Sequence, residues 1–393
     1  MSPASITLSK MCFKVATQLR PAQIDSCAWP RGSWRHCFNV AVACLLASSF
    51  LGHAEPLRII VAGDGRADYP DPNDPKQLPS PRSEDKNGFN KIINSEIRDA
   101  VRNEKAEILV WTGDIVNVNY SAGPEFDDKT RFFRNGLSAW RKLMQPLYQN
   151  RVKVLPTRGN HEVFWYDEQH RELKIPDATK IWTTTFSGRY ALPVREPSGL
   201  SFYYVRDSVL MIGLDQYEHG EEHSVNQAWL DKVLRKNRKP FIFAYGHEPA
   251  FPNGGMNGPE DSLAHNLEER DRMWRSLSDA GAQVYFCAHD HFYDHMIASA
   301  ENGAYKMHQV TAGTAGAPFF GHQDTKNGSE GTSYYPPAPG WNLKPVRHFD
   351  FIYGYVLITI NGNRATIAFK GRTLDGKYTT KDSFGYSAGS TTN

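Results

Sequence analysis

The sequence lacks a cysteine framework. Of its five cysteines, four lie in the first 54 residues, and Cys287 is the only one after that point. A single cysteine forms no internal disulfide, and it excludes a zinc site built from several thiolates. The chain after residue 54 must therefore be held together by its hydrophobic core.

The sequence also lacks an excess of one charge. Its 393 residues carry 45 basic and 43 acidic side chains, and no basic segment stands out, so nothing indicates a nucleic-acid partner. The apolar run at 38–51 is too short to cross a bilayer as an ordinary helix, and we expect no transmembrane helix in the mature chain. A hydrophobic content of 40% is enough for a large core in one large domain or two ordinary ones.

The apolar run belongs to a secretory signal pattern in residues 1–54. Arg31 and Arg35 precede the run, and residues 52–54 place small side chains where a signal peptidase reads them. We expect cleavage near Ala54 and export to the periplasm or the cell exterior; the alternative is a buried N-terminal helix. The remaining chain has 40 basic and 42 acidic residues.

Strand and helix patterns alternate through residues 55–373, which we expect to form one domain. Early strands are expected at 57–62, 107–111 and 152–155, with helices at 89–103 and 132–148. This order predicts parallel pairing through right-handed crossovers.

The later part of the domain is expected to contain antiparallel strands as well. Further strands are expected at 201–205, 209–212, 240–245, 283–287 and 305–311, helices at 224–235 and 267–277, and a hairpin with an Asn-Gly turn at 351–370. The segment 163–200 has no assignment, and 321–345 is typical of a loop. Residues 374–393 form a polar tail that we expect to be loose.

Polar side chains follow five of the expected strands. The clusters are Asp64, Gly113-Asp114, Asn160-His161, His247, and His289 with His291. Each cluster alone is more readily explained as turn chemistry or an exposed loop. Together they are harder to explain, because the carboxyl ends of parallel strands meet at one edge of a sheet. So many polar groups would be costly to crowd together without bound cations.

The types of side chain in these clusters indicate the metals. Carboxylates, an amide oxygen and imidazoles, without a thiolate, suit Mn, Fe or Zn. Two such ions activate water and clamp the oxygens of a transferring phosphoryl group, so no serine or cysteine nucleophile is needed.

The ordered motifs resemble those of the calcineurin-like metallophosphoesterases, which include the purple acid phosphatases. The motifs are Asp64, Gly113-Asp114, Gly159-Asn160-His161-Glu162, Gly246-His247 and Ala288-His289-Asp290-His291. The resemblance runs from about residue 57 to 320. It implies an α/β fold, a four-layer α/β/β/α sandwich of two mixed sheets flanked by helices, with a two-metal centre. The hairpin at 351–370 is similar to the closing strands of that fold.

The resemblance also implies a role for each matching residue. Asp64 and His291 would hold the first metal, Asp114 would bridge both, and Asn160, His247 and His289 would hold the second. His161 would not bind metal; it would stabilise developing charge and protonate the leaving oxygen. Glu162 is expected to orient His161, and the loop at 312–318 to shape the site.

Three positions depart from the family pattern. Many members have a histidine two residues after the first aspartate, where this chain has Arg66, which is always charged and cannot bind a metal in that way. Arg66 either binds a phosphate oxygen of the substrate or is a solvated loop residue. Asn117 replaces the ligating tyrosine of purple acid phosphatases, so we expect no Fe(III) charge-transfer colour. Ala288 replaces the usual glycine.

The sequence therefore predicts an exported hydrolase that uses metal-activated water on small-molecule phosphate esters. The sequence is compatible with phosphomonoesters and with phosphodiesters as substrates. It does not indicate the oligomeric state. The alternative is a degenerate, non-catalytic member that uses the scaffold for binding, and Arg66 is the residue that favours it.

Overall fold

The computed structural model describes residues 55–67, 87–120, 129–166, 171–217, 222–253, 258–319 and 335–389. The account below concerns the unit Pro56–Asn393. The expected signal segment lies outside the described residues. Among the described residues, no helix is long and apolar enough to cross a membrane.

The first sheet has six strands in the order β16-β15-β14-β1-β2-β3. Its parallel part contains β1 (Leu57–Ala62), β2 (Ile108–Thr112) and β3 (Lys153–Thr157). Its antiparallel part contains β14 (Gly354–Asn361), β15 (Arg364–Arg372) and β16 (Tyr378–Ser387), with β14 paired to β1. The strands β1 to β3 are almost continuously apolar because both faces of this part of the sheet are covered.

The second sheet has eight strands in the order β13-β11-β12-β10-β9-β8-β7-β6. The parallel strands at its centre are β8 (Val209–Gly213), β9 (Phe241–Tyr245), β10 (Val284–Cys287) and β12 (Met307–Ala312). The antiparallel strands are β6 (Val194–Arg195), β7 (Phe202–Arg206), β11 (Tyr293–Ala300) and β13 (Trp341–Phe349). A separate ribbon pairs β4 (Phe164–Tyr166) with β5 (Glu172–Lys174).

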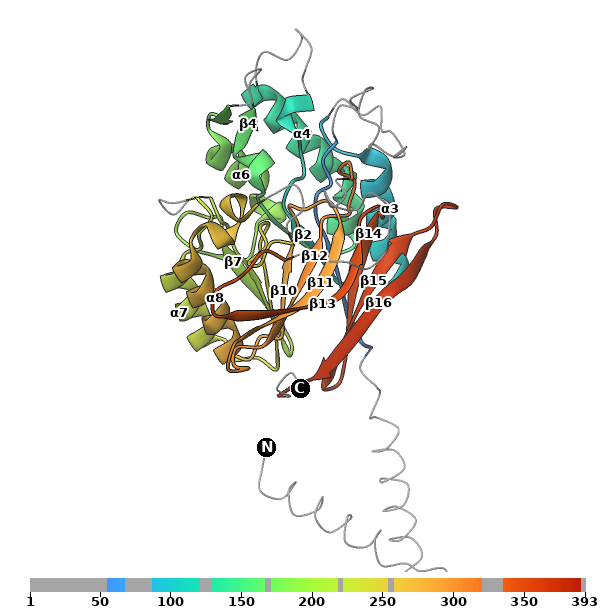
Figure 1. The fold of residues 1–393 in the computed structure, drawn as a ribbon. Coiled ribbons are helices and arrows are strands. Elements are labelled where there is room, and N and C mark those ends of the chain that lie inside the picture. The colour runs from blue at the N-terminus through green and yellow to red at the C-terminus, as the bar shows by residue number, and fades with distance from the viewer. Residues whose placement is uncertain are drawn as a thin grey trace, which may run out of the picture. The chain divides into compact units, whose positions relative to one another are not determined.

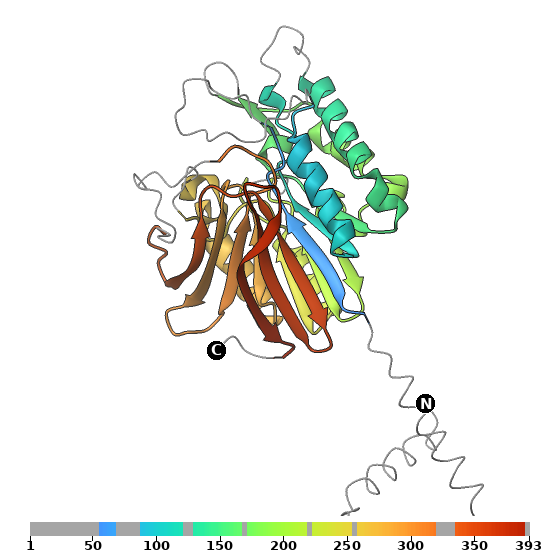
Figure 2. The same ribbon diagram turned by 90° about the vertical axis from the view of Figure 1, so that its right-hand side faces the viewer.

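Helices lie on the outer faces of both sheets. The helices are α3 (Lys91–Asn103), α4 (Lys129–Leu143), α5 (Gln145–Gln149), α6 (Ala178–Thr185), α7 (Gln227–Lys236) and α8 (Leu267–Asp279). Short 3-10 turns occur at η1 (Val118–Tyr120), η3 (Asn160–Glu162), η4 (Gly188–Tyr190), η5 (Pro259–Asp261) and η6 (Leu263–His265). Figure 1 shows α7 and α8 beside the second sheet, and Figure 2 shows α3 beside the strands of the first.

Alternation along the strands divides the core into layers. On β8, Val209 and Met211 belong to the core that β1 and β2 share, whereas Leu210 and Ile212 pack with residues of α7 and α8. This is the period-2 pattern of a strand buried on both faces. The expected four-layer α/β/β/α sandwich of two mixed sheets is confirmed.

Three expectations about individual elements were wrong. The polar clusters lie on two sheets and not on the edge of one parallel sheet. The tail after Leu374 is not loose, because Tyr378–Ser387 forms β16 and pairs along β15. The predicted loop at 321–345 contains the start of β13, and β11 is a strand that the sequence pattern does not predict.

Candidate metal centre

The six expected ligands lie just beyond the ends of strands from both sheets. Asp64, Asp114 and Asn160 follow β1, β2 and β3, His247 follows β9, and His289 and His291 follow β10. Because the parallel strands of both sheets end at the same edge of the sandwich, side chains far apart in the sequence meet there.

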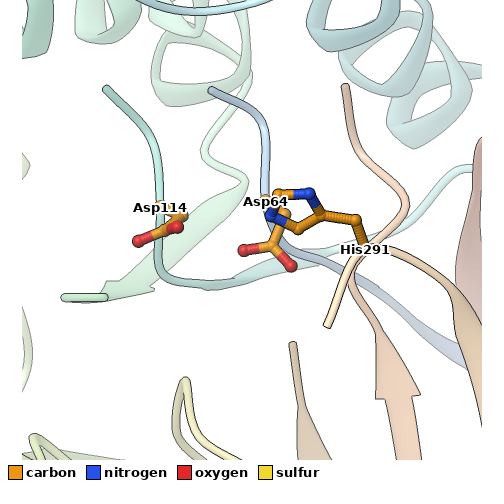
Figure 3. A group of neighbouring side chains, drawn as sticks. All are labelled: Asp64, Asp114 and His291. Carbon is orange, nitrogen blue, oxygen red and sulfur yellow. The ribbon is translucent and has the colours of Figure 1, made fainter. Parts of the chain in front are cut away.

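The first group of candidate ligands at this edge consists of Asp64, Asp114 and His291. One ligand atom from each lies within 4.8 Å of the other two, and all three side chains are buried (Figure 3). Within the described part of the chain, neither carboxylate oxygen of Asp64 has a hydrogen-bond partner. Burial raises the pKa of Asp64 well above its usual value, and the charge of Asp114 raises it further. A bound cation removes this cost, so the group fits a metal ion.

The second group converges on the Nε2 atom of His247. That atom lies 3.1 Å from Asn160 Oδ1, 3.0 Å from His289 Nδ1 and 3.4 Å from Asp114 Oδ1. His247 Nδ1 lies 2.8 Å from the carbonyl oxygen of Thr112, which only accepts, so Nδ1 carries the proton. The lone pair on Nε2 therefore points at the other candidate ligands, as a metal-binding imidazole requires.

Contacts behind the ligands also orient the other two histidines. His291 Nδ1 donates to the carbonyl of Pro318 at 2.7 Å, which leaves its Nε2 as the acceptor. His289 Nε2 lies 3.5 Å from Asp261 Oδ2. Burial alone would lower the pKa of His289, but the hydrogen bond and charge of Asp261 raise it to about 10. Asp261 was missed from the sequence, since nothing in its neighbourhood marks it.

The backbone of three candidate ligands is strained. Asp64, Asp114 and His289 have φ values of 55°, 53° and 72°, in the left-handed region that non-glycine residues seldom adopt. Gly159 permits the close approach of two loops, because a Cβ there would lie 2.2 Å from Asp114 Oδ1. Likewise a Cβ on Gly313 would lie 2.3 Å from Asp64 Oδ2, so the loop at 312–318 packs directly against this ligand.

Glu162 holds the loop of Asp114 and does not orient His161 as expected. Its carboxylate accepts hydrogen bonds from the backbone amides of Asp114, Ile115, Val116 and Gly159 at 2.8 to 3.0 Å. These bonds join the loops after β2 and β3.

His161 lies beside Asp114 through both backbone and ring. Its backbone N–H donates to Asp114 Oδ1 at 3.1 Å, and its Nε2 lies 3.9 Å from Asp114 Oδ2. Burial by itself raises the pKa of Asp114, but His247, His161 and then Arg66 together hold it well below its usual value. The ring of Tyr166 is 6.2 Å from that of His161.

Arg66 is buried among the expected metal ligands, so the alternative of a solvated loop residue is wrong. Its Nε donates to Asp114 Oδ2 at 3.1 Å, and its Nη2 lies 3.1 Å from His291 Nε2. Its backbone N–H donates to the carbonyl of Asp114 at 2.9 Å, and an isolated bridge pairs it with Phe89.

Two buried polar contacts near the site were missed from the sequence. Arg158 and Asp215 form a bidentate ion pair at 2.8 and 2.9 Å, between the ends of β3 and β8. Gln216 Oε1 accepts from the backbone amides of His247 at 2.6 Å and Glu248 at 2.8 Å, and so fixes the loop after β9. Neither Arg158 nor Gln216 carries a local signal of burial, because their partners are distant in the sequence.

Two positions that depart from the family pattern are accommodated locally. Asn117 Oδ1 accepts from the backbone N–H of Asn119 at 2.8 Å, at the start of η1. The methyl group of Ala288 faces Gly63, where a Cβ would lie 2.7 Å from it, so the missing side chain at 63 makes room for the extra one at 288.

Comparison with known proteins agrees with this geometry. The family model described as calcineurin-like phosphoesterase matches residues 57–293. No curated protein matches the chain in sequence.

Solved structures share the fold at low sequence identity. A purple acid phosphatase from yellow lupin (Lupinus luteus) seeds is 14% identical with a TM-score of 0.57, covering 86% of this chain and 54% of that one. PhoD is 11% identical with a TM-score of 0.52, covering 86% and 70%. GAP50, described as the anchor in the inner membrane complex of Plasmodium, is 14% identical with a TM-score of 0.50, covering 86% and 90%. The chain thus spans about half the length of the lupin protein.

Proposed function

We propose that this chain works with two transition-metal ions (Mn, Fe or Zn), bound beyond the ends of the parallel strands. The chain belongs to the calcineurin-like phosphoesterase family and is a hydrolase of phosphoric ester bonds. The observation that carries the proposal is the buried group of Asp64, Asp114 and His291, whose ligand atoms lie within 4.8 Å of one another. The carboxylate oxygens of Asp64 support it, since they have no hydrogen-bond partner among the described residues and burying such a carboxylate is costly.

Each ligand has a place in this proposal. Asp64 and His291 would hold the first ion, Asp114 would contact both ions, and Asn160, His247 and His289 would hold the second. When bound, such ions lower the pKa of a water molecule and neutralise charge on the phosphoryl oxygens.

The remaining side chains would handle the substrate. His161 Nε2 lies 3.9 Å from Asp114 Oδ2, and His161 would donate a proton to the leaving oxygen. Arg66 carries a permanent positive charge at the same place and would bind a phosphate oxygen of the substrate. We propose small-molecule phosphate esters, mono- or diesters, as substrates, and export after cleavage near Ala54, on the strength of the signal pattern.

A substrate panel tests this function. Purified protein, stripped with chelator and reloaded with Mn, Fe or Zn, would be assayed on phosphomonoesters, phosphodiesters, nucleoside diphosphate sugars and cyclic nucleotides. We expect hydrolysis of at least one class with metal and none in chelator. Metal binding without hydrolysis of any class would favour the non-catalytic binding protein instead.

Replacing His161 with alanine is expected to harm substrates with poor leaving groups most. An alkyl ester needs a proton on its leaving oxygen, whereas a nitrophenyl ester does not. Loss of a general acid costs typically 10² to 10⁴-fold, so we expect a kcat loss of about 10²-fold or more on alkyl esters. The measurement is kcat on a series of esters graded by leaving-group pKa. Equal losses along the series would argue against the acid role.

A further inference from the structure

The guanidinium group of Arg66 contacts the same atoms that the first metal ion would need. It lies 3.1 Å from Asp114 Oδ2 and 3.1 Å from His291 Nε2. The proton on His291 Nδ1 is committed to Pro318, so Nε2 is the one lone pair that this imidazole offers. An arginine hydrogen bond and a metal bond to that lone pair exclude each other.

From this geometry we infer that Arg66 is a built-in competitor for the first metal ion, so that the two ions bind with unequal affinity. The inference rests on the proposed function and concerns how its metal centre fills. In metal-free protein the guanidinium supplies positive charge to the buried carboxylates of Asp64 and Asp114. The first ion must displace it, whereas at the second group the contacts of His247 Nε2 are with Asn160 Oδ1, Asp114 Oδ1 and His289 Nδ1, none of them a guanidinium.

The backbone of Arg66 allows such a displacement without unfolding the loop. Its N–H is bonded to the carbonyl of Asp114 at 2.9 Å, and the bridge to Phe89 fixes the segment on its other side. Displacement by the first ion therefore concerns the side chain, while these backbone contacts can stay in place. A displaced guanidinium remains at the site, where a phosphate group is a suitable new partner.

The inference predicts two classes of metal site. Titration of metal-free protein with Mn²⁺, followed by calorimetry and checked by metal analysis, should give one tight and one weak ion, with dissociation constants about 10-fold apart or more, which corresponds to about 1.4 kcal/mol. Arg66→Met removes both the competing donor and a positive charge, and both changes favour a cation. The weak site should therefore tighten by about 10-fold or more, while the tight site changes little.

Matched variants separate this effect from general damage. Arg98→Met removes an arginine that is paired with Asp99 on α3, away from the ligands, and should leave both affinities unchanged. Arg66→Lys keeps the charge but loses the planar fork, so its weak site should fall between the wild-type and Arg66→Met values. Thermal unfolding gives a second readout: Mn²⁺ should raise the Tm of Arg66→Met more than that of the wild type, because the metal-free variant lacks compensating charge.

Three results would overturn the inference: equal affinities in the wild type, a weak site unchanged by Arg66→Met, or one ion in both proteins. One ion in the wild type and two in Arg66→Met would support it in its strongest form. The outcome is independent of turnover. Unequal binding without hydrolysis would defeat the proposed function alone, and hydrolysis with two equal sites would defeat the inference alone.

Discussion

Replacing Asp114 with asparagine is expected to reduce kcat by about 10³-fold or more, equivalent to about 4 kcal/mol of transition-state stabilisation. Asparagine has the same shape and keeps one oxygen, so it can still accept the backbone N–H of His161. It loses the negative charge that a ligand shared by two cations must carry. The loss should fall on kcat and persist at saturating substrate and metal.

The matched control is Asp99→Asn, the same substitution on the outer face of α3. The Asp99 side chain is 46% exposed and pairs with Arg98, so the exchange should leave kcat unchanged. Circular dichroism and thermal unfolding would establish that both variants fold. A folded Asp114→Asn enzyme with full activity would end the bridging role that we propose for this residue.

Replacing Arg158 with methionine is expected to have the largest effect on stability, a loss of about 3 to 5 kcal/mol in the free energy of unfolding. The substitution leaves the carboxylate of Asp215 buried without its partner, while both side chains are at most 2% exposed in the native pair. The pair also joins the end of β3 to the end of β8, so it links the two sheets beside the site. Urea unfolding followed by circular dichroism would measure the change.

An exposed ion pair between the same two sheets provides the control. Arg206 on β7 lies 2.9 Å from Glu107, which precedes β2, and these side chains are 44% and 47% exposed. Arg206→Met should cost no more than about 1 kcal/mol. The double variant Arg158→Met with Asp215→Leu should be more stable than Arg158→Met alone, because it no longer buries an unpaired charge. Equal costs at the buried and exposed pairs would contradict this account.

The sequence was sufficient to find the parallel strands and the side chains at their ends. Strand cores such as Ile108–Thr112 are short, apolar and followed by a glycine and a carboxylate, which are local signals. Sequence alone does not tell which strands belong to which sheet, because β1 to β3 and β8 to β10 are all short and mainly apolar. The pairing of strands in the structure separates them into two sheets.

The residues that were misjudged depend on distant partners. Arg66 meets His291 across 225 positions, and nothing near Arg66 shows that it is buried. The strand β16 is rich in polar residues because it lies at the edge of its sheet, and its Asp382 accepts from Tyr293 on β11 at 2.8 Å. In the sequence, Asp382, Phe384 and Tyr386 stand at every second position, and this spacing is the local sign of a strand. Glu162 was misassigned because the sequence does not show that four backbone amides converge on it.

The division of the ligands between the two sheets has a mechanical consequence. Asp64, Asp114 and Asn160 project from one sheet, and His247, His289 and His291 from the other, in a chain whose one described cysteine, Cys287, is free. The proposed ions would therefore link the two sheets at this edge, as a disulfide bond links two segments of a chain. Chelation would then remove one link between the two sheets as well as the activity, while the core that they share would remain.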